Sequence, residues 1–190
     1  MARVLPYQQA MLPTLRCVRS VLLLFLAASL LSAGEFAATV VSVADGDTLT
    51  VLHDDRKVRV RLFGIDCPEK GQPFGTEARR FTTGLALGKE VTVIEKDIDR
   101  YGRIVATMVL ADGRNLNNEI VATGWAWWYK RYAPGDEVLQ RLEAQARKDR
   151  RGLWAETASV PPWEWRKQVP PRADKHRSQS RSQRRDTQVR

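Results

Sequence analysis

The sequence has few residues that could form a disulfide framework or a zinc site. Its 190 residues include two cysteines and two histidines. Cys17 precedes an apolar run, so a processed chain would keep Cys67 alone, and one cysteine cannot form an internal disulfide. His53 and His176 belong to no cluster with zinc-ligand spacing. These absences exclude a disulfide-rich domain and argue against a zinc enzyme, and Cys67 is expected to be a small buried thiol.

The central part of the chain lacks net basic charge, although the whole chain carries +9. Residues 1–33 hold three arginines and no acid, and residues 166–190 hold nine Lys or Arg and two Asp. The remaining segment, 34–165, therefore carries a net charge of −1. A basic surface attracts nucleic acid without a specific site. Here the bulk charge lies at the two ends, so any such chemistry in the central segment has to come from a site.

The chain also lacks an apolar run of full membrane-spanning length. Residues 21–31 are almost uniformly apolar, but the run is shorter than the roughly 20 residues that a bilayer requires. Arginines precede it and small residues follow it at 32–34, an order typical of a secretory signal peptide. We therefore expect residues 1–34 to be a signal peptide of a protein exported to the periplasm or secreted. The alternative is an uncleaved anchor that attaches the protein to the inner membrane through residues 21–31.

Short β-branched segments and polar turns dominate the region that follows. With 43% hydrophobic residues the chain can form a core, and alternation such as that of residues 57–63 indicates strands with one wet face. We predict a compact α+β domain over residues 35–165, a small, partly open OB-fold barrel. Its five strands would cover 38–43, 48–52, 57–63, 90–95 and 103–110, the first three as an antiparallel meander, and about three helices would cover 75–88, 116–123 and 134–151. Residues 166–190, rich in Arg, Ser and Gln, are expected to form a basic disordered tail.

Three short motifs contain acids and arginines close to predicted turns. They are Asp45-Gly46-Asp47-Thr48, the segment from Arg61 to Glu69, and Asp99-Arg100-Tyr101-Gly102-Arg103. A single Asp at a strand end is usually a solvated turn residue. Asp47 and Asp66 end neighbouring predicted strands, however, so their carboxylates can converge. Hard oxygen ligands of this kind suit calcium or magnesium.

The same motifs hold residues suited to phosphate chemistry. Glu69 follows Asp66 closely and can act as a general base toward a water molecule. Arg61 and Arg103 lie on or at the start of predicted strands, and guanidinium groups pair with phosphoryl oxygens through two parallel hydrogen bonds. Each arginine alone would be a surface charge. Together with the three acids they indicate phosphodiester hydrolysis.

In order and spacing these motifs resemble those of the staphylococcal nuclease (thermonuclease) family, over residues 38–154. The resemblance implies an OB-fold barrel and calcium-dependent hydrolysis of DNA and RNA that leaves 3′-phosphate ends. Asp47, Asp66 and the backbone carbonyl of Cys67 would ligate calcium, Glu69 would activate the water, and Arg61 and Arg103 would clamp the scissile phosphate. Arg100, Tyr101 and Tyr132 would contact the substrate.

The sequence departs from the family at Lys130, where the nucleotide pocket of the family has a second tyrosine. Trp125, Trp127, Trp128 and Tyr129 precede it and could stack on bases or belong to the core. OB barrels often bind single strands without cutting them, so a non-catalytic OB-fold module that binds single-stranded nucleic acid is the alternative function. Because all five catalytic positions hold the expected residue types, the enzyme is favoured. No protein partner is indicated, and we expect a monomer.

Overall fold

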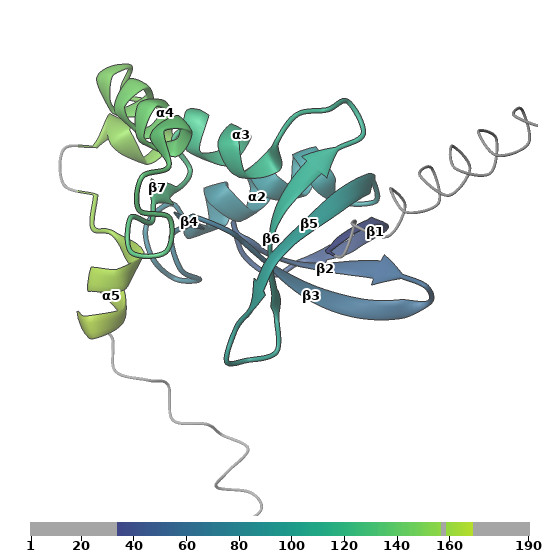
Figure 1. Cartoon of the computed structure of the whole chain (residues 1–190). Helices are drawn as coiled ribbons and strands as arrows, with labels where there is room; N and C mark the ends of the chain where they lie inside the picture. Colours follow the sequence, from purple (N-terminus) through teal and green to yellow (C-terminus); the bar gives the residue numbers. More distant parts are fainter. Residues whose placement is uncertain (1–33, 157–158, 169–190) are drawn as a thin grey trace, which may run out of the picture.

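The barrel forms the centre of the protein. A computed structural model describes residues 34–156 and 159–168. Of the signal peptide or anchor predicted over 1–34, residues 1–33 lie outside the described part. In this part of the chain, five strands form one closed sheet and two further strands pair separately beside it (Figure 1). The strands are β1 (Glu35–Val43), β2 (Thr48–His53), β3 (Arg56–Leu62), β4 (Ile65–Asp66), β5 (Glu90–Ile98), β6 (Ile104–Leu110) and β7 (Trp127–Trp128). The fold class, α+β with an OB-type barrel, is as predicted.

The barrel is closed, whereas the sequence predicts a partly open one. Its strand order is β1-β2-β3-β6-β5, and β5 pairs again with β1. The predicted antiparallel meander of β1, β2 and β3 is present. Closure needs one parallel contact, between β3 and β6, in which Val60, Arg61 and Leu62 face residues 104–106. Such long-range pairing carries no local sequence signal, so the closure could not be predicted from the alternation of the strands.

Strand β3 shows how the barrel is stabilised and how it carries the site. Val60 and Leu62 point inward and are buried, whereas the intervening Arg61 points outward. Fully burying a side chain such as Leu62 stabilises the fold by about 1.5–3 kcal/mol. The alternation that builds the core therefore fixes Arg61 on the outer surface of the barrel.

The helices lie mostly on one side of the barrel in Figure 1. They are α2 (Gly75–Ala86), α3 (Leu116–Ala122), α4 (Glu137–Lys148), the 3-10 turn η1 (Gly152–Ala155) and α5 (Pro162–Gln168). The third helix begins at Glu137 and not at Pro134, because Asp136 accepts a hydrogen bond from the N–H of Leu139 at 3.0 Å and caps the helix. None of the described helices is long and apolar enough to cross a bilayer.

Besides the short turn η1, a strand pair and a helix have no counterpart in the prediction. The first is the β4–β7 pair, in which Asp66 faces Trp127 and Ile65 faces Trp128. Trp127 and Trp128 are buried, so these two aromatic residues belong to the core. The second is α5, which extends through residues 166–168, the first three residues of the segment that composition assigns to a tail. The rest of that segment lies outside the described residues.

Candidate active site

Asp47, Arg61 and Asp66 form the centre of a polar cluster on the outside of the barrel. Asp47 lies just before β2, Arg61 near the end of β3, and Asp66 at the end of β4. The guanidinium of Arg61 donates from Nη1 to Oδ1 of Asp47 and from Nη2 to Oδ1 of Asp66, both at 2.6 Å. The structure thus brings the two predicted metal ligands together on either side of one predicted catalytic arginine.

Glu69 and Arg166 extend this cluster. Nη2 of Arg166 donates to Oδ2 of Asp66 at 2.7 Å, and Nη1 of the same side chain donates to Oε1 of Glu69. Successive partners therefore run Asp47, Arg61, Asp66, Arg166, Glu69, and we call these five side chains the charge row. Acids and bases alternate along it, so each internal member pairs with two opposite charges. The sequence predicts four of the five, whereas Arg166 falls in the segment that composition assigns to the tail.

Burial gives the charge row unusual electrostatics. Asp47 and Asp66 are 1% and 0% exposed. Burial raises the pKa of Asp47 well above its ordinary value, and Arg61 opposes that rise. Burial works against the charge of Arg61 as well, but Asp47 and Asp66 outweigh it and raise the pKa of its guanidinium. Arg61 therefore stays charged, and additional positive charge close to Asp47 would favour its ionised form.

Arg103 joins the site through Thr48. Its Nη1 lies 3.4 Å from Oγ1 of Thr48, which donates to Oδ1 of Asp47 at 3.3 Å. Asp99 orients the arginine by accepting from its Nε at 2.7 Å and from its backbone N–H at 3.0 Å. Burial works against the charge of Asp99, but these bonds and one from the N–H of Tyr101 lower its pKa. The carboxylate is thus ionised and holds Arg103 beside the charge row.

The predicted substrate contacts lie on exposed aromatic side chains. Tyr101 is 64% exposed and lies beneath two guanidinium groups, those of Arg100 at 4.8 Å and Arg103 at 5.5 Å from the ring centroid. Tyr132 is 61% exposed and packs edge-on against Tyr129. The structure brings Tyr101 next to Arg103, whereas it gives Tyr132 no contact with the charge row.

Lys130, where the family resemblance leads us to expect a tyrosine, lies over an aromatic ring. Its Nζ lies 4.9 Å from the centroid of the Trp128 ring, and the residue is exposed. The ring of Tyr129, one position earlier, lies flat against Trp163 of α5 with centroids 5.2 Å apart. The aromatic surface near this end of the site therefore comes partly from α5.

Two residues that the sequence analysis missed hold the loop that carries Glu69. The buried Gln72 accepts from the N–H of Glu69 at 2.9 Å and donates from Nε2 to the carbonyl of Val160 at 2.7 Å. Gly75 opens α2 directly against this loop, where an added Cβ would lie 2.2 Å from the carbonyl oxygen of Glu69. Only glycine allows this approach. A glycine at the first position of a predicted helix is the one sequence signal that could have indicated this close contact between Gly75 and the loop.

The side chain of Cys67 is a free, buried thiol. The side chain is 3% exposed, as predicted, and burial raises its pKa well above the ordinary value, so it stays protonated. The backbone N–H of Cys67 donates to Oδ2 of Asp47 at 2.7 Å. The turn at Cys67 is therefore fixed directly to one of the predicted metal ligands.

The chemistry of the donor set fits a hard divalent cation. Asp47 and Asp66 each present a carboxylate oxygen to the same guanidinium. Over residues 34–156 and 159–168, no three His, Cys, Asp or Glu side chains are arranged to hold a metal ion. Calcium also takes backbone carbonyls and water as ligands. Two carboxylates can therefore serve it, provided that backbone and solvent complete its coordination.

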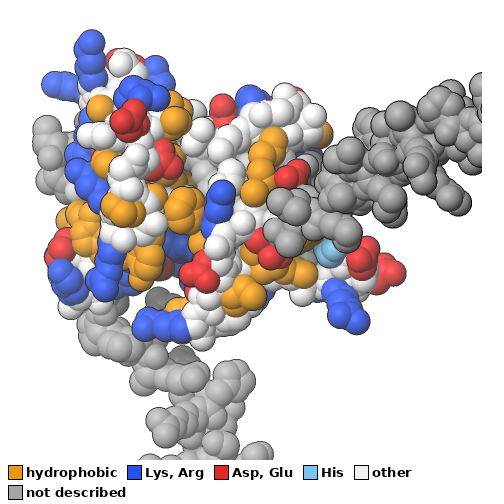
Figure 2. All heavy atoms as spheres, viewed as in Figure 1, with side chains coloured by type: hydrophobic (Ala, Val, Ile, Leu, Met, Phe, Trp, Pro, Cys, Tyr) orange, Lys and Arg blue, Asp and Glu red, His pale blue; other side chains and the backbone are white. Residues whose placement is uncertain are grey.

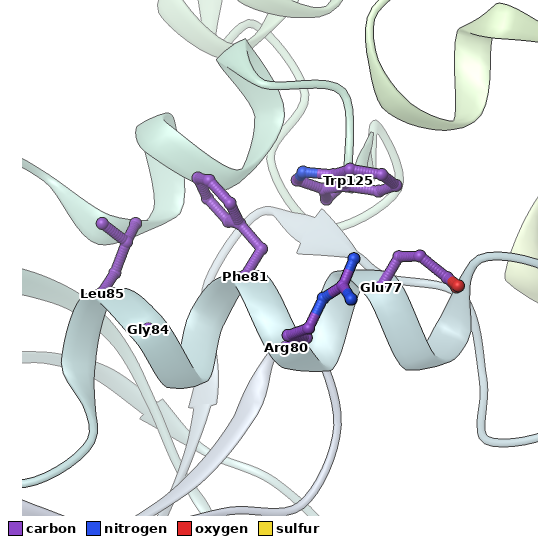
Figure 3. Close-up of a pocket in the computed structure, with 6 residues that line it drawn as sticks. All are labelled: Glu77, Arg80, Phe81, Gly84, Leu85 and Trp125. Atoms are coloured by element: carbon purple, nitrogen blue, oxygen red, sulfur yellow. The ribbon is translucent and has the colours of Figure 1, made fainter.

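A separate groove of about 270 Å³ lies between α2 and Trp125. Figure 3 shows the rings of Phe81 and Trp125 and the side chain of Arg80 facing it. None of its lining residues belongs to the charge row: Glu77, Arg80, Phe81, Gly84, Leu85 and Trp125. The groove is therefore separate from the candidate active site.

Basic side chains gather on the helical side of the molecule. In the view of Figure 2, Lys and Arg are frequent over α4 and α5, whereas the barrel strands show acidic and basic side chains intermixed. The mixture agrees with the net charge of −1 that the sequence gives for residues 34–165. In this view, basic charge is therefore concentrated over the helices and is not spread evenly over the surface.

Comparison with known proteins agrees with this geometry. Residues 59–156 match the model of the staphylococcal nuclease homologue family. The chain is 44% identical over 149 residues to Protein ParB of Escherichia coli, a match that covers 74% of this chain and 84% of that protein. It is 40% identical over 142 residues to a micrococcal nuclease of Shigella flexneri, covering 70% of this chain and 82% of the relative. An uncharacterized endonuclease of Escherichia coli is 45% identical over 127 residues, covering 67% and 82%.

Proposed function

The chain belongs to the staphylococcal nuclease family, and from that membership we propose that it is a calcium-dependent nuclease that hydrolyses DNA and RNA and leaves 3′-phosphate ends. That it is a phosphodiesterase of the nuclease type follows from the family and its relatives. The calcium dependence and the products are the proposal. The observation that supports it is the charge row, in which two buried carboxylates, a partly exposed glutamate and two arginines are joined by successive hydrogen bonds.

The residues divide into a cation-binding group and a phosphate-binding group. Asp47, Asp66 and the backbone carbonyl of Cys67 would hold calcium, which when bound polarises a phosphoryl oxygen as a Lewis acid. Arg61 and Arg103 donate N–H groups to the other phosphoryl oxygens, where negative charge grows in the transition state. Tyr101, with Arg100 against its ring, offers a surface for the sugar or base next to the phosphate.

Glu69 moves the proton. A carboxylate oxygen of Glu69 takes a proton from a water molecule as the water oxygen bonds to phosphorus. The bond from phosphorus to O5′ breaks, and O5′ leaves with a proton from solvent. The phosphate remains on the 3′ oxygen. Since Glu69 is 36% exposed at its side chain, water can reach it without any movement of the barrel.

Removal of divalent cations should abolish the activity. We expect the full chain to degrade plasmid DNA, single-stranded DNA and RNA in calcium, to stop in a chelator, and to recover when calcium is restored, with less recovery in magnesium. The measurement is release of acid-soluble nucleotides. Asp47→Asn should be inactive and Asp54→Asn, at a hairpin position with a side chain 86% exposed, should be active. This pair excludes a contaminating nuclease.

The same digests test the products. Fragments with 3′-phosphate ends should be extended by a polymerase only after phosphatase treatment. Undiminished hydrolysis in chelator would contradict the role of the cation, and fragments that extend directly would contradict the position of cleavage. Retained binding of single strands without cleavage would favour the binding module instead.

We also propose that the protein is exported, on the strength of the apolar run at 21–31 and the arginines before it. The mature chain should begin at Gly34 or Glu35. Cell fractionation with N-terminal sequencing measures this directly. An intact N-terminus in the membrane fraction would favour the anchor, and an intact N-terminus in the cytoplasm would contradict both.

A further inference from the structure

Helix α5 is docked on the site by three separate contacts. Its Trp163 stacks on Tyr129 at an interplanar angle of 4° and meets Trp127 of β7 edge-on at 6.5 Å. The segment before the helix is tied to the loop of Glu69 through Gln72, which bonds both the N–H of Glu69 and the carbonyl of Val160. The third contact is Arg166 on Asp66 and Glu69. Figure 1 shows α5 next to the β4–β7 pair and apart from α4.

We propose that Arg166 is a positioning residue of the active site, which holds the carboxylate of Glu69 in place and shares Asp66 with the bound cation. The inference rests on the roles proposed above for Asp66 and Glu69. It adds a third arginine, supplied by a helix that lies beyond residues 59–156, the part that matches the family.

The geometry separates the two effects of this arginine. Glu69 is partly exposed and sits in a loop, so its side chain has several rotamers open to it. The bond from Nη1 of Arg166 restricts that choice. On the other side, Nη2 of Arg166 occupies Oδ2 of Asp66, the oxygen that Arg61 leaves free. Arg166 therefore aligns Glu69 and at the same time competes for a ligand oxygen.

The net charge of the site indicates how Arg166 affects cation binding. Asp47, Asp66 and Glu69 with Arg61 and Arg166 sum to one net negative charge, and loss of Arg166 leaves two. A divalent cation is attracted more strongly to the second arrangement. Removing Arg166 should therefore tighten calcium binding while it weakens catalysis, because the freed Glu69 no longer faces the water reliably.

The test compares Arg166→Ala and Arg166→Lys with a matched control in the full chain. Lys167→Ala removes the same charge from the next position of α5, where Lys167 pairs with Glu164 and not with the charge row. Calcium affinity is measured by titration calorimetry without substrate, and kcat and KM are measured on a short oligonucleotide at saturating calcium. Thermal unfolding checks the fold of each variant.

We expect Arg166→Ala to bind calcium about fivefold more tightly and to lose about tenfold or more in kcat with KM little changed. Arg166→Lys keeps the positive charge but loses the two guanidinium nitrogens that bond Asp66 and Glu69 separately. It should bind calcium like the parent chain and have a kcat between those of Arg166→Ala and the parent. Lys167→Ala should match the parent in both. If the parent chain hydrolysed DNA equally well in chelator, the proposed calcium dependence would be wrong. The comparison of kcat among the Arg166 and Lys167 variants would still test whether Arg166 positions Glu69.

Three results would overturn the proposal. Tighter calcium binding with a higher kcat would make α5 an autoinhibitory element. Weaker calcium binding with a lower kcat and a lower melting temperature would make Arg166 a purely structural anchor. Values for Arg166→Ala that equal those of Lys167→Ala would show that the contact has no role in the reaction.

Discussion

Replacing Glu69 with glutamine is expected to lower kcat by about a hundredfold to ten-thousandfold, the usual contribution of a general base. Glutamine keeps the size of the side chain and can still pair with Arg166, but it cannot accept the proton of the water. The KM for DNA should change little, because the two arginines proposed to bind the phosphate, Arg61 and Arg103, are untouched. Steady-state rates in calcium give kcat, and binding of a labelled oligonucleotide shows that the substrate site is intact.

The fold should survive this change. Glu69 is partly exposed at its side chain, and its ion pair belongs to the class that contributes at most about 1 kcal/mol. Glu137→Gln, on the surface of α4 with a side chain 81% exposed, is the matched control and should keep full activity. A Glu69→Gln chain with more than a tenth of the parent kcat would remove Glu69 from the role of base.

Replacing Arg61 with alanine is expected to damage both stability and activity. The substitution leaves Asp47 and Asp66 buried without the guanidinium between them. Removing one partner of a buried ion pair typically costs about 3–5 kcal/mol of unfolding free energy. Urea unfolding at neutral pH measures the loss. Nuclease activity should fall by about a hundredfold or more, because the variant lacks one of the two donors proposed to bind the phosphate.

Two further measurements test whether the effect of Arg61→Ala comes from its position between the two carboxylates. Arg59→Ala removes the same charge two positions earlier on the same face of β3, where the residue is exposed, and should leave both quantities close to those of the parent. A saturating divalent cation should restore part of the stability of Arg61→Ala, because it supplies positive charge between the two carboxylates. An Arg61→Ala chain as stable as Arg59→Ala would show that the charge row does not depend on this arginine.

Local patterns predict most of the barrel and four of the five residues that meet in the charge row. Alternation in β3 predicts both the inward residues and the outward Arg61, and the turn residues after β1 predict where Asp47 lies. Closure through the parallel β3–β6 pair escapes prediction, because the two strands are separated by about forty residues and no turn joins them. The two-residue strands β4 and β7 are too short for any periodic signal.

The contribution of α5 escapes prediction for a related reason. Pro161-Pro162 marks the end of a compact region by composition, yet proline is also well tolerated in the first turn of a helix, and Pro162 is the first residue of α5. The charged and polar residues 166–190 that follow are typical of a disordered tail. What docks the helix is a long-range set of contacts from Gln72, Tyr129 and Asp66, none of which is visible near Arg166 in the sequence.

The alternating arrangement of the charge row has a consequence for how such enzymes can diverge. Each internal member forms ion pairs with two neighbours. Loss of Arg61 or Arg166 alone therefore leaves two acids without one of their positively charged partners. Loss of an end pair, Asp47 with Arg61 or Glu69 with Arg166, removes equal and opposite charges and leaves the remaining acids with an arginine partner. Descendants that abandon catalysis and keep only the barrel are therefore expected to have lost adjacent members as pairs, in two coupled steps, more often than single members.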